Sequence, residues 1–334
     1  MRKCVVILAL LFALPLAADN AQRIREAVAL HDAGKYDEAI AIYKAVLADD
    51  HSNDSAAYEL ALTYDAKQDF ANCRALLEPR LAKPGPFQAA MYAVLANCLE
   101  GAGQADRAIA TYRKGLAIAP NDSQLLYNLA VSLASRSGYD EARALLEREL
   151  RVRPDHGSGH LLLAQIFAEQ RFRAPAVAEY LRFLAVEPAS ERSKPAGEAL
   201  LGLLNLGVER KGEKNVKVTL DPDSPKEEGD YSGVETGMAL VSGARFTDEK
   251  KLTEFDRTRD QIVTVVSILV ETAEGSNYTA QVNVPFFAEL RKKELLDAFA
   301  AIVLLPLNLP GQGEWLKKNA RAIQAYQAFQ VEKR

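Results

Sequence analysis

Four histidines and a few neighbouring carboxylates are the side chains of this sequence with the clearest capacity for chemistry. His156 and His160 are four residues apart, a spacing that places two imidazoles on one face of a helix, where they could bind a metal ion. Gly157 and Gly159 lie between the two histidines, which favours a turn and the start of a helix. We therefore predict loop and helix-start roles for the two histidines.

Adjacent carboxylates occur at Asp140-Glu141 and Glu227-Glu228. Adjacent side chains diverge on a helix, so these pairs favour solvated surface positions over an acid–base site. The chain contains no nucleophile elbow, zinc-protease motif, phosphate loop or dinucleotide-binding motif, and residues 213–334 contain no histidine. The sequence thus predicts a protein that is not an enzyme, with no cofactor and no metal.

The composition excludes several other classes. The 334 residues are 49% hydrophobic and 26% charged, which is typical of a globular protein with about two domains. Lysine and arginine total 41 against 45 aspartates and glutamates, a net charge of −4 that argues against nucleic-acid binding. Three cysteines are too few for a disulfide scaffold.

Residues 1–18 have the layout of a secretory signal peptide. Arg2 and Lys3 precede the apolar run Cys4–Leu14, and Pro15-Leu16-Ala17-Ala18 follows with small residues for cleavage. An uncleaved anchor and a lipoprotein are the alternatives, although Cys4 precedes the apolar run instead of following it. We expect an exported protein, periplasmic or secreted, whose mature chain has no transmembrane span.

A period of thirty-four residues organises the following half of the chain. It is seen in the prolines Pro120, Pro154 and Pro188, and in the small residues Ala39, Cys73, Ala108, Ala142 and Ala176, with one extra residue between Cys73 and Ala108. The pattern predicts two antiparallel helices in each unit. Small residues allow the two helices to approach closely, and the proline ends the second helix.

These residues resemble the tetratricopeptide repeat, in five units from about residue 20 to 189. The resemblance implies a mainly α fold, a right-handed superhelix, with the amphipathic segment Ser193–Arg210 as the capping helix. The expected organisation is a signal peptide (1–18), a repeat array (19–189), a capping helix and linker (190–212) and a mainly helical domain (213–334).

The resemblance also implies that the first helices of the repeats line a groove that binds peptides or helices. Its expected positions are Tyr58, Asp65, Asn97, Glu100, Gln124, Tyr127, Asn128 and Gln165. Asn97 and Asn128 either hold a peptide backbone or are solvated helix-face residues, whereas Tyr58 and Tyr127 are candidate interface anchors. The groove is acidic and neutral, which favours a neutral or basic partner.

Cys73 and Cys98 remain once the signal peptide is removed. The repeat resemblance places their helices next to each other, and an exported protein meets an oxidising compartment. The pair is therefore either a disulfide or two buried thiols.

Residues 213–334 follow no repeat. Apolar and polar residues alternate over Asn215–Leu220, which is typical of a short strand. Helical patterns cover Tyr231–Phe246, Glu249–Thr272, Val284–Leu305 and Gly313–Glu332. The best structural interpretation is a helical bundle packed against the repeats.

The function that this organisation favours is a non-catalytic adaptor or assembly factor of the cell envelope, which binds a protein or peptide in the repeat groove. An alternative is a small-ligand receptor or enzyme in the C-terminal domain, with the repeats as its docking module. Self-association through the groove is a third hypothesis.

Overall fold

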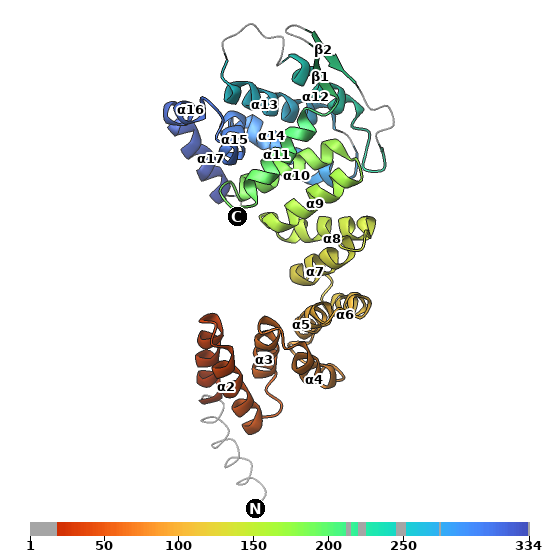
Figure 1. The fold of residues 1–334 in the computed structure, drawn as a ribbon, viewed down its shortest axis with the longest axis vertical. Coiled ribbons are helices and arrows are strands. Elements are labelled where there is room, and N and C mark those ends of the chain that lie inside the picture. Colours follow the sequence, from red (N-terminus) through yellow and green to blue (C-terminus); the bar gives the residue numbers. More distant parts are fainter. Residues whose placement is uncertain (1–18, 212–214, 220–224, 245–251, 274, 333–334) are drawn as a thin grey trace, which may run out of the picture. The chain divides into compact units, whose positions relative to one another are not determined.

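The computed structural model describes residues 19–211, 215–219, 225–244, 252–273 and 275–332 (Figure 1). The predicted signal peptide lies outside the described residues. Contacts divide the chain into two compact units, Met1–Gly138 and Tyr139–Arg334, and each is described by itself. Both units are built from helices, which confirms the mainly α prediction. Among the described residues no helix combines the length and the apolar content needed to cross a bilayer.

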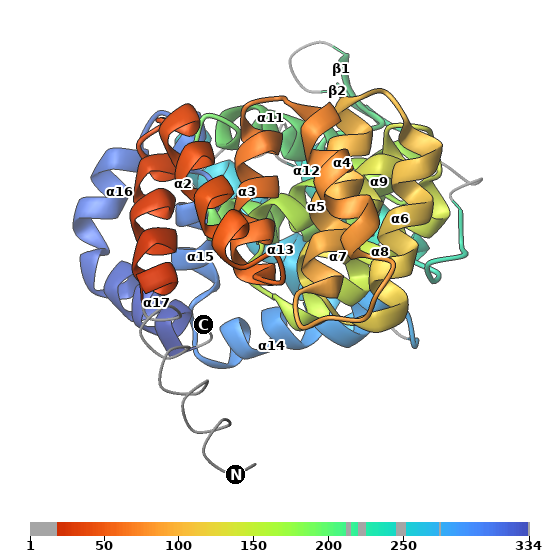
Figure 2. The same cartoon turned by 90° about the horizontal axis from the view of Figure 1, so that it is seen from below.

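The first unit is a row of helical hairpins. Residues 19–32 are helical. The helices that follow are α2 (Tyr36–Asp49), α3 (Asp54–Ala66), α4 (Phe70–Arg80), α5 (Gln88–Gly101), α6 (Ala105–Ile118) and α7 (Ser123–Ala134). Successive helices pack side by side (Figure 2). The side chains of Asn53 and Asp122 accept hydrogen bonds from the backbone of Ala56 and Leu125, and so cap the start of α3 and α7.

Small and aromatic residues produce this close packing. Ala39, Cys73 and Ala108, at the repeating small position, are completely buried. A side-chain carbon added to Gly101 would come within 2.3 Å of the ring of Phe70, which begins the preceding hairpin's second helix. The spacing detected in the sequence therefore corresponds to points where helices touch without room for a larger side chain.

A disulfide joins Cys73 on α4 to Cys98 on α5, with the Cα atoms 6.5 Å apart. Both cysteines are fully buried. The bond links the second hairpin of the first unit to the third.

The second unit begins with three helices of the repeat region and continues to residue 332. Its elements are α8 (Tyr139–Val152), α9 (Gly157–Glu169), α10 (Arg173–Val186), α11 (Ser193–Leu204), β1 (Val208–Lys211), β2 (Asn215–Val218), α12 (Ser232–Ala244), α13 (Glu254–Thr272), the π-helix η1 (Thr279–Asn283), α14 (Val284–Lys292), α15 (Leu296–Val303), the 3-10 turn η2 (Leu305–Leu307), α16 (Gln312–Lys318) and α17 (Ala320–Glu332).

Helix α10 lies at the centre of the second unit. All its residues from Ala174 to Ala185 are buried. It packs against α9, α11, α12, α15 and η1. The last helix of the repeat region therefore shares one hydrophobic core with the C-terminal helices, whereas the sequence pattern alone suggests a boundary at residue 189.

The prediction of one amphipathic helix over Ser193–Arg210 is wrong at its end. Helix α11 stops at Leu204, and Val208–Lys211 forms strand β1 antiparallel to β2. Gly207 turns the chain with φ +79°, and a side-chain carbon there would lie 2.3 Å from the carbonyl oxygen of Thr219. Only glycine fits this turn, which explains why the helical pattern does not continue.

The sequence pattern predicts one helix in each of two C-terminal segments, and the structure has two helices in each. The segment 284–305 divides into α14 and α15 because Glu294 adopts φ +57° and the backbone N–H of Leu295 donates to the carbonyl of Leu290 at 2.8 Å. The segment 313–332 divides into α16 and α17 at Asn319, whose side chain donates to the carbonyl of Trp315 at 2.9 Å. Apolar spacing runs through both breaks, so periodicity does not reveal them.

Helix α8 carries a carboxyl group that resists ionisation. Burial, and next the charge of Glu228, raise the pKa of Glu147 to about 7 from 4.5. Glu228 itself pairs with Arg143 at 3.2 Å. The folded state therefore binds a proton that the unfolded state has released, and stability falls as the pH rises from about 4.5 to 7.

We expect Glu147→Gln to raise the free energy of unfolding by about 2 kcal/mol at about pH 8, because the amide carries no buried charge. Near a pH of about 4.5 the gain should almost vanish, since both states then approach protonation. Denaturant unfolding at the two pH values measures this difference. Glu169→Gln, at an exposed position of α9, serves as the control. An equal effect of Glu147→Gln at both pH values would contradict the prediction.

Candidate functional site

Helices α3, α5 and α7, the first helices of three consecutive hairpins, present a face that lacks positive charge. Helices α3, α5 and α7 pack against one another in sequence. We define the first-helix face by Tyr58, Glu59, Asp65, Asn97, Glu100, Gln124, Tyr127 and Asn128. All are exposed or half-buried. These three fully described helices contain no lysine or arginine, whereas α4 and α6 carry five.

Asn97 forms the centre of a lateral hydrogen-bond network on this face. Its Oδ1 accepts from the Asn128 side chain at 3.0 Å and from the Tyr112 hydroxyl at 2.6 Å. Asn97 also hydrogen-bonds to the Asp65 carboxylate. The structure therefore brings together three predicted groove residues, one from each of three consecutive hairpins, and holds Asn97 in a fixed orientation.

The acidic side chains of the face are partly desolvated. Burial raises the pKa of Asp65, against the lowering effect of its hydrogen bond to Asn97. Burial also raises the pKa of Glu59. Glu100 accepts a hydrogen bond from the Ser132 hydroxyl. A cationic group placed on this face would compensate charges that water reaches only in part.

Aromatic side chains lie near the amino-terminal ends of the same helices. The Tyr58 ring stacks on Phe87, with the ring centroids 5.7 Å apart and the planes at 24°. Burial raises the pKa of the Tyr58 hydroxyl, so it remains a neutral donor. Tyr127 is half-buried on α7 and Gln124 is exposed beside it. The sequence pattern does not indicate Phe87 as a groove residue, because Phe87 lies between the turn at residues 83–86 and the start of α5.

Gln165 is an exposed residue of α9 and belongs to the second unit. Its place in the groove therefore stays a prediction.

The two histidines considered for metal binding contact different carboxylates. His156 precedes α9, and its Nδ1 lies 2.9 Å from Glu149. His160 is in the first turn of α9, and its Nδ1 lies 2.6 Å from Glu179. Within the described ranges, no group of three histidine, cysteine or acidic residues is arranged to hold a metal.

His160 is part of a buried polar network that the sequence analysis did not find. Glu179 on α10 is completely buried, and its two oxygens contact His160 and the side-chain amide of Asn283. The His160 Nε2 lies 2.9 Å from the carbonyl of Pro154. A signal was present in the sequence, since Glu179 and Arg182 interrupt an otherwise apolar helix three residues apart.

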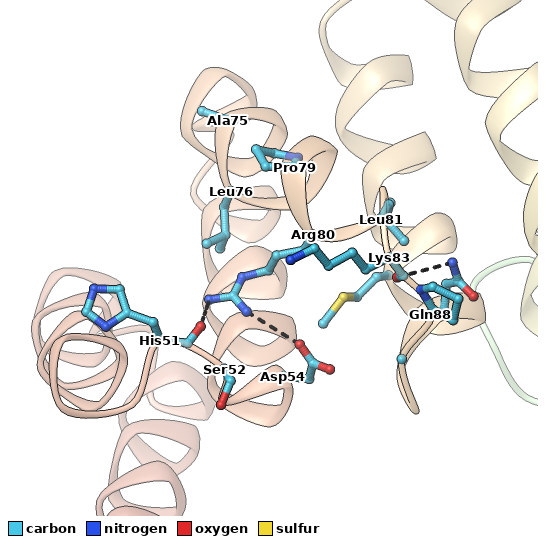
Figure 3. Close-up of a pocket in the computed structure, with 13 residues that line it drawn as sticks. His51, Ser52, Asp54, Ala75, Leu76, Pro79, Arg80, Leu81, Lys83 and Gln88 are labelled. Carbon is cyan, nitrogen blue, oxygen red and sulfur yellow. Dashed lines mark hydrogen bonds and ion pairs between the residues drawn. The ribbon is translucent and has the colours of Figure 1, made fainter.

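A separate pocket of about 580 Å³ opens on the first unit between the α2–α3 turn and helix α4 (Figure 3). Arg80 spans it, donating to the carbonyl of His51 at 2.8 Å and approaching the Asp54 carboxylate at 3.4 Å. Pro79 precedes Arg80 at the end of α4. Because the Arg80 guanidinium is already paired within the protein, we assign no ligand to this pocket.

The sequence profile of the tetratricopeptide repeat matches residues 30–98 and 99–166. No protein of curated function matches the chain. Among solved structures, PilF of Pseudomonas aeruginosa is similar over 57% of this chain and 86% of its own, with 18% identity and a TM-score of 0.51. A thermophilic TPR protein of Thermus thermophilus, TTC0263, is similar over 56% of this chain and 100% of its own, with 20% identity and a TM-score of 0.44.

A third similar structure is YrrB, described as a TPR protein with an unusual peptide-binding site. It is 19% identical, covers 50% of this chain and 85% of its own, and has a TM-score of 0.40. The repeat matches and the helical-hairpin architecture together define an α-solenoid fold. Residues 30–166 therefore consist of tetratricopeptide repeats, as the spacing of the small residues and prolines predicts.

Proposed function

We propose that the first-helix face binds an extended, neutral or basic peptide segment of a protein partner, and that the protein acts as a non-catalytic adaptor or assembly factor of the cell envelope. The observation that carries this proposal is the separation of charge between the helices. The first helices α3, α5 and α7 contain acidic and neutral residues, whereas the second helices α4 and α6 carry five lysines and arginines.

The hydrogen-bonding groups of the face suit a peptide backbone. Asn97 is fixed by its bonds to Tyr112, Asn128 and Asp65, so the one amide N–H that these bonds leave can donate to a peptide carbonyl with little loss of entropy. The stacked rings of Tyr58 and Phe87 offer an amphipathic surface for an apolar side chain of the peptide. Glu59, half-buried on the same helix as Tyr58, supplies negative charge for a lysine or arginine.

The proposal predicts charge-selective binding. An alternating lysine–leucine peptide should bind more tightly than its glutamate–leucine counterpart, and salt should weaken the interaction. The triple variant Glu59→Gln, Asp65→Asn, Glu100→Gln should weaken binding of the basic peptide by about tenfold, since it removes three partly desolvated charges. Titration calorimetry measures each affinity.

Two comparisons complete this experiment. Asp106→Asn changes an exposed carboxylate on the second helix α6 and should leave the affinity unchanged. Tyr58→Ala combined with Tyr127→Ala should weaken peptides of either charge. Equal binding of the acidic peptide, or an unchanged affinity in the triple variant, would refute the assignment of the partner to this face.

We further propose that residues 1–18 direct export. The Cys73–Cys98 disulfide supports this, because disulfides persist in oxidising compartments such as the periplasm and the secreted space.

A further inference from the structure

A cavity of about 320 Å³ in the second unit is lined by a buried arginine, Arg182. The cavity lies among the carboxyl-terminal end of α10, the loop after α8, helix α14 and Gln330 of α17. Arg182 is only 8% exposed. Its guanidinium forms no ion pair with any carboxylate of the described residues.

The hydrogen bonds of Arg182 are incomplete. Its Nη2 donates to the carbonyl of Pro154 at 2.9 Å, while its Nε is buried and has no hydrogen-bond partner among the described residues. The guanidinium lies over the Phe286 ring, 3.9 Å from the centroid. A buried arginine with a missing acceptor is costly for a protein to maintain. An occupant that brings an acceptor oxygen or a negative charge to the guanidinium would offset this cost.

The neighbouring acids do not fill this role. Glu179 lies one helical turn before Arg182, but its oxygens are bound by His160 and Asn283. The charge of Glu179 favours the charged form of Arg182 from a distance, but Glu179 forms no ion pair with Arg182 among the described residues. Asp155 is exposed, so water screens its charge. Glu289 lies 3.9 Å from Lys293.

Apart from Arg182, Asp155, Glu289 and Gln330, the residues that line the cavity are apolar. Val186, Val282 and Pro285 line it together with the Phe286 ring. Val282 belongs to the π-helix η1, a type of segment that is frequent at functional sites. The volume corresponds to about ten water molecules, at roughly 30 Å³ each in the liquid. A ligand of this size has room for one polar group beside a short apolar chain or ring.

We propose that this cavity binds a carboxylate that adjoins an apolar group, with the carboxylate at Arg182 and the apolar part between Val186 and Phe286. The carboxylate forms a charge-assisted hydrogen bond with the guanidinium of Arg182 and supplies the ion pair that Arg182 lacks among the described residues. Two sources share this chemistry, a free short-chain carboxylic acid and the terminal carboxylate of a peptide that ends in an apolar residue.

The test titrates the full chain with octanoate, octanamide and octylamine by calorimetry. Octanoate should bind at least about tenfold more tightly than octanamide, and octylamine should not bind, because the cavity selects for a negative acceptor. Titration with N-acetyl-leucine then separates the sources. Tighter binding than octanoate assigns the site to a peptide terminus, and weaker binding assigns it to a free acid.

Variants connect the binding to Arg182. Arg182→Met should weaken the binding of octanoate by about tenfold and leave the affinity for octanamide unchanged. Arg321→Met, at an exposed position of α17, should change neither affinity. Val186→Phe fills the cavity without altering charge and should weaken both ligands, which keeps the test decisive if Arg182→Met fails to fold. Absence of octanoate binding, or an octanamide affinity equal to that of octanoate, would overturn the proposal.

Discussion

Removing the Cys73–Cys98 disulfide is expected to lower the free energy of unfolding by about 3 kcal/mol. The bond closes a loop with a sequence separation of 25 residues and restricts the unfolded chain. Both cysteines are buried, so the double variant Cys73→Ala, Cys98→Ala also loses some packing. Denaturant unfolding of the oxidised protein, the reduced protein and the double variant measures the effect.

The reduced protein and the double variant should unfold at similar denaturant concentrations, since both lack the crosslink. Alkylation of the exported, unreduced protein provides the control, with no modified thiol at either position and an amino terminus at Asp19. Two alkylated thiols in that sample would show that the pair is not bonded in the mature protein, and stability should then be insensitive to reductant.

Glu179→Ala is expected to destabilise the second unit by about 3 to 5 kcal/mol. The substitution leaves His160 and Asn283 in the core without the carboxylate oxygens that they contact. It also opens space next to α10, which is buried on every side. Thermal and denaturant unfolding of the full chain report the loss.

Glu198→Ala is the matched comparison, because Glu198 is an exposed glutamate on the adjacent helix α11. It should change the free energy of unfolding by less than about 0.5 kcal/mol. The variant Glu179→Gln keeps the shape and one acceptor oxygen, so its cost should fall between the two alanine variants. If Glu179→Ala and Glu198→Ala had equal effects, the buried network would contribute nothing to stability.

The repeat architecture could be predicted because it depends on local spacing. Small residues such as Ala108 repeat where two helices touch, and each hairpin contacts mainly the hairpins next to it in sequence. The capping side chains of Asn53 and Asp122 act within three residues of their own positions. Features of this kind appear directly in a one-dimensional pattern.

The core of the second unit could not be predicted in the same way. Asn283 reaches Glu179 across 104 residues, and Gln330 donates to the carbonyl of Ala185 across 145. No repeat connects these segments, so periodicity gives no sign that they meet. The hairpin β1–β2 was missed in part because Val208 continues the apolar spacing of α11 although Gly207 has already turned the chain.

The candidate peptide-binding site was anticipated residue by residue, but not in its bonding. Family resemblance selects Asn97 and Asn128 as groove positions. The bond between them, and the Tyr112 hydroxyl that orients Asn97, depend on the distance between neighbouring hairpins. The Arg182 cavity escaped the sequence analysis because its walls come from four separate segments of the chain.

The central position of α10 determines the order in which the protein can be completed during synthesis. The first unit is compact within the residues up to 138, so its hairpins can pack as soon as they emerge. Helix α10 has to wait for Phe299 on α15 and for Tyr326 on α17, which belong to the same core. Until then its apolar surface needs protection from aggregation, and a fragment cut after the last repeat would keep that surface exposed permanently.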